Sequence, residues 1–291
     1  MKNSLLTVAL VFNATLHARA QTNFQEVIMH KKISAQDSSR LMHYLIGYGL
    51  FPGNGQFVND RKVYLDSALS VVPFSAFLWF QKAYSLLFAK KYEIGMPFLD
   101  SAVKYDREGY IGYRGYMKCI FQKHCRESIA DLKTAQQLSG KGDVEDHTYD
   151  FYIGLCYLQL NEFDSSERLF ENSINEVRKN NGWQSIHYLD WFYLGITLFE
   201  KNDFNGAYDC FDSCLHIYPK FSDAKFYKSW CLTELHQYKP ALGLISEANN
   251  DFDEGYTINE DNARLEQYPY QVNKYILRES LEILTRKNDQ K

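Results

Sequence analysis

The stretch Asp190–Pro219, DWFYLGITLFEKNDFNGAYDCFDSCLHIYP, decides the fold. Three small residues, Gly195, Ala207 and Cys214, are spaced among large apolar ones, and a proline ends the run. Two antiparallel helices pack closely only where the facing side chains are small, and large side chains fill the spaces beside that contact. The spacing therefore predicts a helix–turn–helix unit that begins at Tyr188, in which the backbone of the second helix lies against Gly195.

The same spacing recurs along the chain. Units with small residues at matching positions begin near Met42, Ala76, Gly109, His147, Tyr188 and Ser222. The unit near Gly109 is degenerate, and its turn contains a one-residue insertion. The pattern W…LG…A…F…A…P over 34 residues resembles the tetratricopeptide repeat. That resemblance implies an all-α fold, a right-handed α-solenoid of about six helix–turn–helix repeats with a C-terminal capping helix.

The repeats divide the chain into four segments. We expect a signal peptide over residues 1–20, an N-terminal segment over 21–41, the repeat region over 42–255, and an acidic loop with the capping helix over 256–291. The capping helix is predicted from the apolar residues that share one helical face after Pro269. A cap is required because each repeat leaves an apolar face uncovered.

The N-terminus has the features of a targeting segment. Lys2 gives it a positive start, residues 5–16 are mostly apolar, and the small residues Ala18 and Ala20 precede a cleavage site. The apolar run is too short to cross a bilayer, as is every later one. We therefore expect an exported protein, periplasmic or extracellular. If the leader is not cleaved, the chain is instead a cytoplasmic adaptor.

Charge and composition bear on the class of partner. The net charge is −4, from 32 basic and 36 acidic residues, and no window carries a dense stripe of Lys and Arg. Nucleic acid is therefore not an expected partner. Aromatic residues make up 16% of the chain, with 22 Tyr and 20 Phe. This share is high, so the positions of these rings within the repeat matter for function.

The aromatic residues concentrate at the ligand positions of the repeat. In the tetratricopeptide repeat family the first helix of each unit lines a concave groove, and its fifth, sixth and ninth positions commonly contact ligands. The corresponding partner-binding residues expected here are Phe80, Tyr84, Phe151, Tyr152, Phe192, Tyr193, Phe226, Tyr227 and Trp230. The phenylalanines at the fifth position are also explained by packing alone. The tyrosines at the sixth position suit a wet interface, because each combines an apolar ring with a polar tip.

No constellation of residues supports catalysis, and we expect no enzyme, no metal site and no cofactor. Cys210, Cys214 and His216 have the spacing C-x3-C-x-H. Cys214, however, falls on a small buried position of the repeat, where a thiol behaves as a small apolar group. His124 and Cys125 are neighbours in sequence, and adjacent residues on a helix do not face each other.

Two further features are a pair of cysteines beside a turn and a cluster of acidic residues. Cys119 and Cys125 flank a turn, so a disulfide between them can form after export. The acidic cluster NNDFDEGYTINED, residues 249–261, fails the calcium-loop template because Phe252 falls on a ligand position. We interpret this cluster as a solvated loop.

Together these features predict a non-enzymatic protein–protein interaction scaffold. It would be exported and would hold a peptide or a partner domain in the aromatic-lined groove, with a role in assembly or maintenance of the cell envelope. That setting follows from the resemblance and the leader alone. The alternative is a carbohydrate-binding component that stacks sugar rings on Tyr152, Tyr193, Tyr227 and Trp230.

Overall fold

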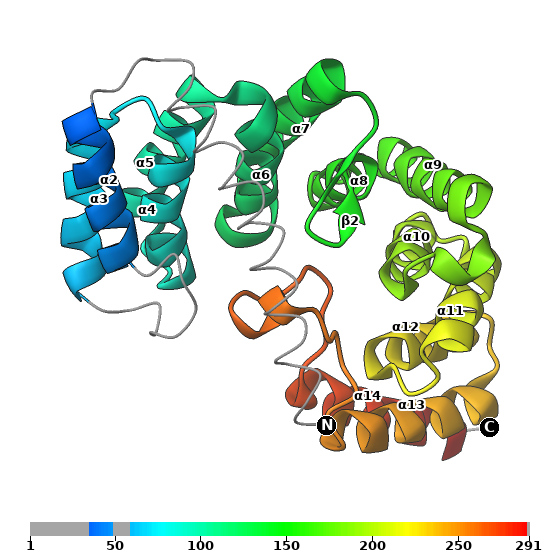
Figure 1. Ribbon diagram of the computed structural model, residues 1–291. Helices are drawn as coiled ribbons and strands as arrows, with labels where there is room; N and C mark the ends of the chain where they lie inside the picture. Colours follow the sequence, from blue (N-terminus) through cyan, green and yellow to red (C-terminus); the bar gives the residue numbers. More distant parts are fainter. Residues whose placement is uncertain (1–34, 49–58, 290–291) are drawn as a thin grey trace. The chain divides into compact units, whose positions relative to one another are not determined.

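The chain folds into consecutive antiparallel helix pairs in the computed structural model, which describes residues 35–48 and 59–289 (Figure 1). The pairs are α2 (Ala35–Tyr48) with α3 (Asn59–Val71), α4 (Ala76–Phe88) with α5 (Tyr92–Tyr105), α6 (Arg107–Met117) with α7 (Cys125–Ser139), α8 (Tyr149–Gln159) with α9 (Phe163–Asn181), α10 (Tyr188–Glu200) with α11 (Phe204–Ile217), and α12 (Ser222–Glu234) with α13 (Tyr238–Asp253). A last helix, α14 (Lys274–Asp289), follows. The expected all-α fold is confirmed, whereas the expected signal peptide lies outside the described residues.

Short elements connect some of the pairs. Two strands, β1 (Asp143–Val144) and β2 (His147–Thr148), pair antiparallel before α8 and are the only strands in the described part of the chain. Single 3-10 turns lie at Trp183–Ser185 and Asp261–Arg264. A π-helical turn, Lys118–Gln122, continues α6. It takes up the extra residue that the sequence indicates for this unit, since a π turn holds one residue more than an α turn.

The chain divides within α6, between Tyr110 and Ile111, into two compact units. In the first unit α2, α3, α4 and α5 pack on one another in sequence order. Its core contains Leu41, Leu65, Ala68, Leu69, Val72, Phe77 and Leu78. Because α2 already begins at Ala35, the repeat start expected near Met42 falls inside this helix.

In the second unit each helix from α7 to α14 packs on the next. Helix α10 begins at Tyr188 and α12 begins at Ser222, the residues at which the repeat pattern places the unit starts. The extra residues before Tyr188 lengthen α9, which runs to Asn181. Gly182 then ends the helix at a φ of 85°, a conformation that favours glycine.

The small positions of the repeat mark the contacts between paired helices. In the α8–α9 pair the Ser166 hydroxyl donates a hydrogen bond to the carbonyl oxygen of Gly154 at 3.0 Å. At Gly195 the neighbour differs from the prediction. A Cβ there would lie 2.7 Å from the ring of Phe211 in α11. Gly195 is therefore small because an aromatic side chain, and not the backbone of the second helix, fills the space beside it.

Helix α14 covers the last pair. It packs on α13, and Leu277 and Leu284 join Ala241, Ile245 and Ala248 in one buried apolar cluster. The expected C-terminal capping helix is thus confirmed. Within the described residues, no helix has both the length and the apolar character that crossing a bilayer requires.

Candidate functional site

The segment between α13 and α14, residues 256–272, lies on the inner side of the row formed by α8, α10 and α12, where Figure 1 draws it in orange. This segment is named the strap, and the inner faces of these three helices are named the groove. The strap has three buried apolar anchors, Ile258, Tyr268 and Val272, none more than 4% exposed. The strap therefore lies where the sequence predicts that a partner binds.

Tyrosines of the groove bind the backbone of the strap. The Tyr193 hydroxyl on α10 donates to the carbonyl oxygen of Pro269, and the Tyr227 hydroxyl on α12 donates to that of Tyr270, each at 3.0 Å. Tyr193 and Tyr227 both occupy the sixth position of their repeats. Two consecutive repeats thus contact two consecutive strap residues in the same way. Because the acceptors are backbone carbonyls, these bonds do not depend on the side chains of the strap.

Asp223, in the first turn of α12, ties the two ends of the strap together. Its Oδ1 atom accepts from the Val272 N–H and its Oδ2 atom accepts from the Thr257 hydroxyl, each at 2.8 Å. Burial raises the pKa of Asp223 to about 6, although these hydrogen bonds act in the opposite direction. Burial thus disfavours the ionised form of the Asp223 carboxyl, whereas the hydrogen bonds from Val272 and Thr257 of the strap favour the ionised form.

The contact between the strap and the groove leaves polar atoms without partners. The Tyr152 hydroxyl in the groove is buried with no hydrogen-bond partner, and so are the Tyr268 hydroxyl and the Asn262 Oδ1 atom in the strap. These are three of the five buried side-chain atoms in this condition among the described residues. Such atoms lose their hydrogen bonds to water without replacement, which weakens the contact.

The predicted partner-binding residues lie on four first helices of the repeats. Phe80 and Tyr84 are on α4, Phe151 and Tyr152 on α8, Phe192 and Tyr193 on α10, and Phe226, Tyr227 and Trp230 on α12. Tyr84, Tyr227 and Trp230 are half-buried, and the others are buried. Phe151, Tyr152, Phe192 and Tyr193 have an exposed fraction of 0%, so with the strap in place these four rings do not form an open surface. Partner binding by these residues stays a prediction.

The fifth-position and sixth-position rings are buried for different reasons. The ring of Phe151 lies 5.7 Å from that of Phe170, and the ring of Phe192 lies 6.0 Å from that of Phe211, measured between centroids. These phenylalanines therefore pack against the second helices of their own repeats. At the sixth position, the Tyr193 and Tyr227 hydroxyls bind the strap, and the Tyr152 ring packs on that of Tyr116.

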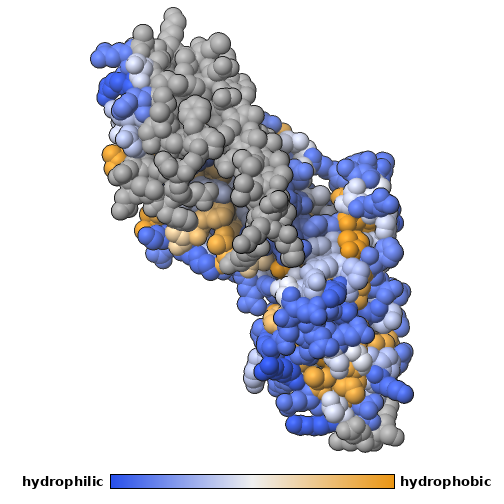
Figure 2. Space-filling model, turned by 60° about the horizontal axis from the view of Figure 1, so that its bottom comes forward, coloured by the Kyte–Doolittle hydropathy of each residue, from blue (hydrophilic) through white to orange (hydrophobic). Residues whose placement is uncertain are grey.

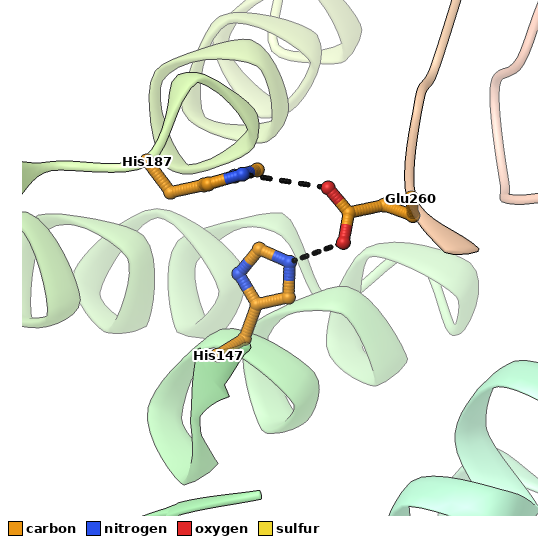
Figure 3. A group of neighbouring side chains, drawn as sticks. All are labelled: His147, His187 and Glu260. Carbon is orange, nitrogen blue, oxygen red and sulfur yellow. Dashed lines mark ion pairs between the residues drawn. The ribbon is translucent and has the colours of Figure 1, made fainter. Parts of the chain in front are cut away.

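Three polar side chains meet beside the groove. His147, in β2, directly precedes α8, and His187 caps the N-terminus of α10. The Nε2 atom of His147 lies 3.6 Å from Oε2 of Glu260 in the strap, and the Nε2 atom of His187 lies 3.4 Å from Oε1. Figure 3 shows the carboxylate facing both imidazoles, which reach it from different elements. His147 is the first residue of its repeat unit and His187 directly precedes the first residue of the next, and nothing in the sequence places Glu260 beside them.

Burial governs the charge of this cluster. Burial, with a contribution from His147, lowers the pKa of His187 to about 4, so His187 is neutral at pH 7. Burial also opposes ionisation of Glu260, but the neighbouring imidazoles outweigh it and hold the pKa of that carboxyl below its usual value.

The other candidate groups have structural surroundings. All six cysteines are free thiols, so the pairing left open at the turn is not made. Cys214 is fully buried, and burial raises the pKa of Cys210 to about 12, which suppresses the reactive thiolate. The interpretation of residues 249–261 as solvated is wrong for two acids. Asp251 is buried and pairs with Lys225 at 2.6 Å, and Glu260 is buried because the strap carries it against the two histidines.

Comparisons with known proteins concern the fold. No family model and no curated protein matches the sequence. Solved structures do match. PilW, a widely conserved type IV pilus biogenesis factor, has 13% identity and a TM-score of 0.55 over 79% of this chain and 98% of that one. Pseudomonas aeruginosa pilF has 14% identity and a TM-score of 0.54, over 76% and 98%. A tetratricopeptide repeat protein from Parabacteroides merdae has 12% identity and a TM-score of 0.54, over 91% and 99%.

The chain has the tetratricopeptide repeat fold. At these identities the likeness establishes the fold alone. On the face shown in Figure 2 the described surface is mainly hydrophilic, and apolar side chains form separate patches. The most exposed large apolar side chains, Tyr275, Val63 and Ile94, lie on α14, α3 and α5. The polar groups that could bind a ligand therefore lie mainly in the groove and in the histidine–glutamate cluster, and not on this outer surface.

Proposed function

We propose that the chain is a non-enzymatic protein–protein interaction scaffold whose groove binds a peptide or a domain of a partner protein. The observation that carries this proposal is the pair of hydrogen bonds from Tyr193 and Tyr227 to consecutive backbone carbonyls of the strap. Main-chain acceptors are present in every polypeptide. The carbonyls of Pro269 and Tyr270 lie in a turn, in which Tyr270 has a φ of 59°. A groove that binds the backbone of one segment through tyrosine donors has the chemistry to bind the backbone of another.

The strap is the internal occupant of this groove. A partner segment replaces it and uses the same tyrosine donors. The unpaired hydroxyls of Tyr152 and Tyr268 reduce the free energy that holds the strap in place. The apparent affinity for a partner is lowered by the fraction of chains in which the strap is seated. Partner binding is therefore linked to release of the strap.

We assign the partner contacts mainly to the side chains that become exposed when the strap leaves the groove. Tyr152, Tyr193 and Tyr227, at the sixth position, become available. Trp230 packs against the apolar cluster of α13 and α14 and is proposed as a contact that does not depend on strap release. The half-buried Tyr84 is proposed as a further contact in the first unit. The phenylalanines at the fifth position hold the helix pairs together and contribute to binding only indirectly.

No observation favours the carbohydrate alternative. Sugar rings stack on an open aromatic face. The rings of Tyr152 and Tyr193 are fully buried, so neither offers such a face while the strap is in place.

The proposed setting is the cell envelope, with export directed by residues 1–20. This part of the proposal is supported by the leader-like N-terminus and by the likeness in fold to PilW, a type IV pilus biogenesis factor. N-terminal sequencing of the mature protein tests the export. We expect Gln21 as the first residue, and an intact Met1 contradicts export by this route.

Supplying the strap as a separate peptide tests the groove. In the test variant, residues 258–271 are replaced by a Gly/Ser linker of the same length. A fluorescently labelled peptide of residues 256–272 is then titrated and its anisotropy followed. We expect saturable binding to the linker variant, and binding at least about 10-fold weaker to the parent chain, whose groove is filled. A folded linker variant that does not bind the peptide refutes the proposal.

Two controls show whether the peptide binds as the strap does. Adding Tyr193→Phe and Tyr227→Phe to the linker variant removes two hydrogen-bond donors, and should weaken binding by about 10-fold or more. A scrambled peptide places the apolar anchors out of register and should bind more weakly than the natural order. Circular dichroism of each variant confirms that the helices remain folded.

A further inference from the structure

We propose that His147, His187 and Glu260 form a binding site for one divalent transition-metal ion of the Zn²⁺ class. The three side chains come from separate parts of the second unit, which are β2, the start of α10 and the strap. Their ligand atoms all lie within 4.8 Å of one another. Two imidazoles with one carboxylate form a donor set that suits zinc-class ions, whereas magnesium and calcium prefer oxygen ligands alone.

The separations fit metal ligation better than hydrogen bonding. An N–H···O hydrogen bond spans about 2.7–3.2 Å, and the two histidine–glutamate distances are 3.4 Å and 3.6 Å. In a tetrahedral site with metal–ligand bonds of about 2.0–2.2 Å, neighbouring ligand atoms lie roughly 3.3–3.6 Å apart. The two distances end on different carboxylate oxygens, Oε2 and Oε1, and one ligand atom from each residue lies within 4.8 Å of the others. Ligation of one ion therefore requires the three side chains to draw together by roughly 1 Å.

His147 supplies an independent observation. Its side chain is 1% exposed, and its Nε2 atom has no hydrogen-bond partner. A buried nitrogen without a partner loses its hydration without compensation. A metal ion in the cluster satisfies this atom and also provides the positive charge that the buried Glu260 carboxylate requires. The competing explanation is a protonated His147 that pairs with Glu260, in which case the cluster does not bind metal.

Neighbouring groups hold the three ligands in place. The His147 ring stacks on Phe151, with 3.9 Å between the ring centroids and 11° between the planes. Tyr188 donates to Oδ1 of Asn259 at 2.6 Å and accepts from the Asn259 N–H at 3.2 Å, which fixes the residue next to Glu260. Ligands that are held in place before the ion arrives lose less conformational freedom on binding it.

The ion would join the strap to the groove, because the repeats provide two ligands and the strap provides the third. This consequence rests on the proposed function. A bound ion would hold the strap in the groove and so restrict the access of a partner to it. The metal site itself does not depend on the proposed function, and it is measured without any partner.

Metal binding is tested on the full chain after removal of metal with EDTA and dialysis. Zn²⁺ is titrated in competition with a chromophoric chelator, and we expect one tight site per chain. Glu260→Gln and His147→Gln should each weaken binding by more than about 100-fold, because changes outside the ligand shell alone weaken it by about 10- to 100-fold. His216→Gln is the matched control, since His216 is exposed on α11 near Cys210 and Cys214 and its replacement should leave binding unchanged.

Three results would overturn the assignment. They are failure of the parent chain to bind Zn²⁺, unchanged binding in Glu260→Gln, and loss of binding in His216→Gln, which would move the ion to the cysteines of α11. Co²⁺ absorption gives a second readout, in which we expect no thiolate charge-transfer band. If His147→Gln does not fold, Glu260→Gln alone carries the test, because it changes only the strap.

Hydrogen–deuterium exchange tests the link between the ion and the strap. We expect Zn²⁺ to slow exchange of residues 256–272 in the parent chain and to have no effect in Glu260→Gln. Unchanged exchange in a parent chain that binds Zn²⁺ would overturn the link. The peptide titration remains a separate test of the groove, so failure of one proposal can be told from failure of the other.

Discussion

Two contacts within the second unit differ in chemistry: the packing of α10 on α11, and the seating of the strap in the groove. Between α10 and α11 the contact is apolar, since Gly195 admits the ring of Phe211 and Ala207 is fully buried. Between the strap and the groove, tyrosine hydroxyls and the carboxylate of Asp223 make the contact, and some buried polar atoms have no partner. The first contact builds the repeat, and the second holds the strap in the groove.

This difference indicates which contacts water or another polypeptide can replace. Water cannot replace an apolar ring, so removing one leaves a cavity. A hydrogen bond to a backbone carbonyl can be replaced by one to water or to another polypeptide at a small net cost. The helix pairs are therefore the stable framework, and the strap is the part that we propose a partner replaces.

Phe211→Ala tests the apolar side of this comparison and has the largest expected effect. Phe211 is fully buried, so its truncation should lower the free energy of unfolding by about 3–5 kcal/mol, measured by urea denaturation. Tyr275→Ala is the control, because Tyr275 is 75% exposed and its loss should change stability by no more than about 0.5 kcal/mol. A loss below about 1 kcal/mol for Phe211→Ala would remove the distinction between the two contacts.

Asp223→Asn tests the clamp of the strap and depends on pH. The pKa of about 6 for the folded chain lies above the usual value of an aspartate. The folded chain therefore binds this proton more tightly than the unfolded chain, and the stability due to this group falls as pH rises from about 4 to about 6. Asp223→Asn should match the parent near pH 4 and exceed it by up to about 3 kcal/mol at pH 7.

The measurement for Asp223→Asn is urea denaturation at both pH values with EDTA present, so that metal does not contribute. Asp253→Asn, which changes an exposed acid at the end of α13, should show no such difference between the two pH values. If Asp223→Asn is less stable than the parent at pH 7, the ionised carboxylate stabilises the contact between the strap and the groove. The strap is then held more tightly than we propose.

Two tyrosines give the finest test and the smallest expected effect. Tyr193 and Tyr152 are fully buried at the sixth position of adjacent repeats, but the Tyr193 hydroxyl is hydrogen-bonded to Pro269 and the Tyr152 hydroxyl has no partner. Tyr193→Phe should lower the free energy of unfolding by about 1 kcal/mol, and Tyr152→Phe should leave it unchanged or raise it by about 1 kcal/mol. Equal losses in the two variants would contradict the distinction.

The framework could be predicted from the sequence because helix pairs depend on local spacing. The pattern that places Tyr188 and Ser222 at the start of repeats also gives the first residues of α10 and α12. Spacing indicates that Gly195 must be small, but it does not identify the neighbouring atoms, and for this reason the backbone contact predicted there is replaced by the ring of Phe211.

The strap could not be predicted in the same way. It has no helical period, and its contacts join distant residues, as when Lys123 donates to the carbonyl of Gln267. The sequence predicts that the sixth-position tyrosines bind a partner. In the structure Tyr193 and Tyr227 bind the backbone of a turn that belongs to the same chain. Partner binding by these tyrosines stays a prediction, and Glu260 was missed because only the path of the strap brings it to the histidines.

The position of the strap near the C-terminus has a consequence for translation. The ribosome makes the groove helices first, and each helix pair can form from contacts that are close in sequence. The bond from Asn262 to Tyr116 joins residues 146 positions apart, so it forms only after the strap itself has been made. In a nascent chain the groove tyrosines are therefore uncovered until the strap is made.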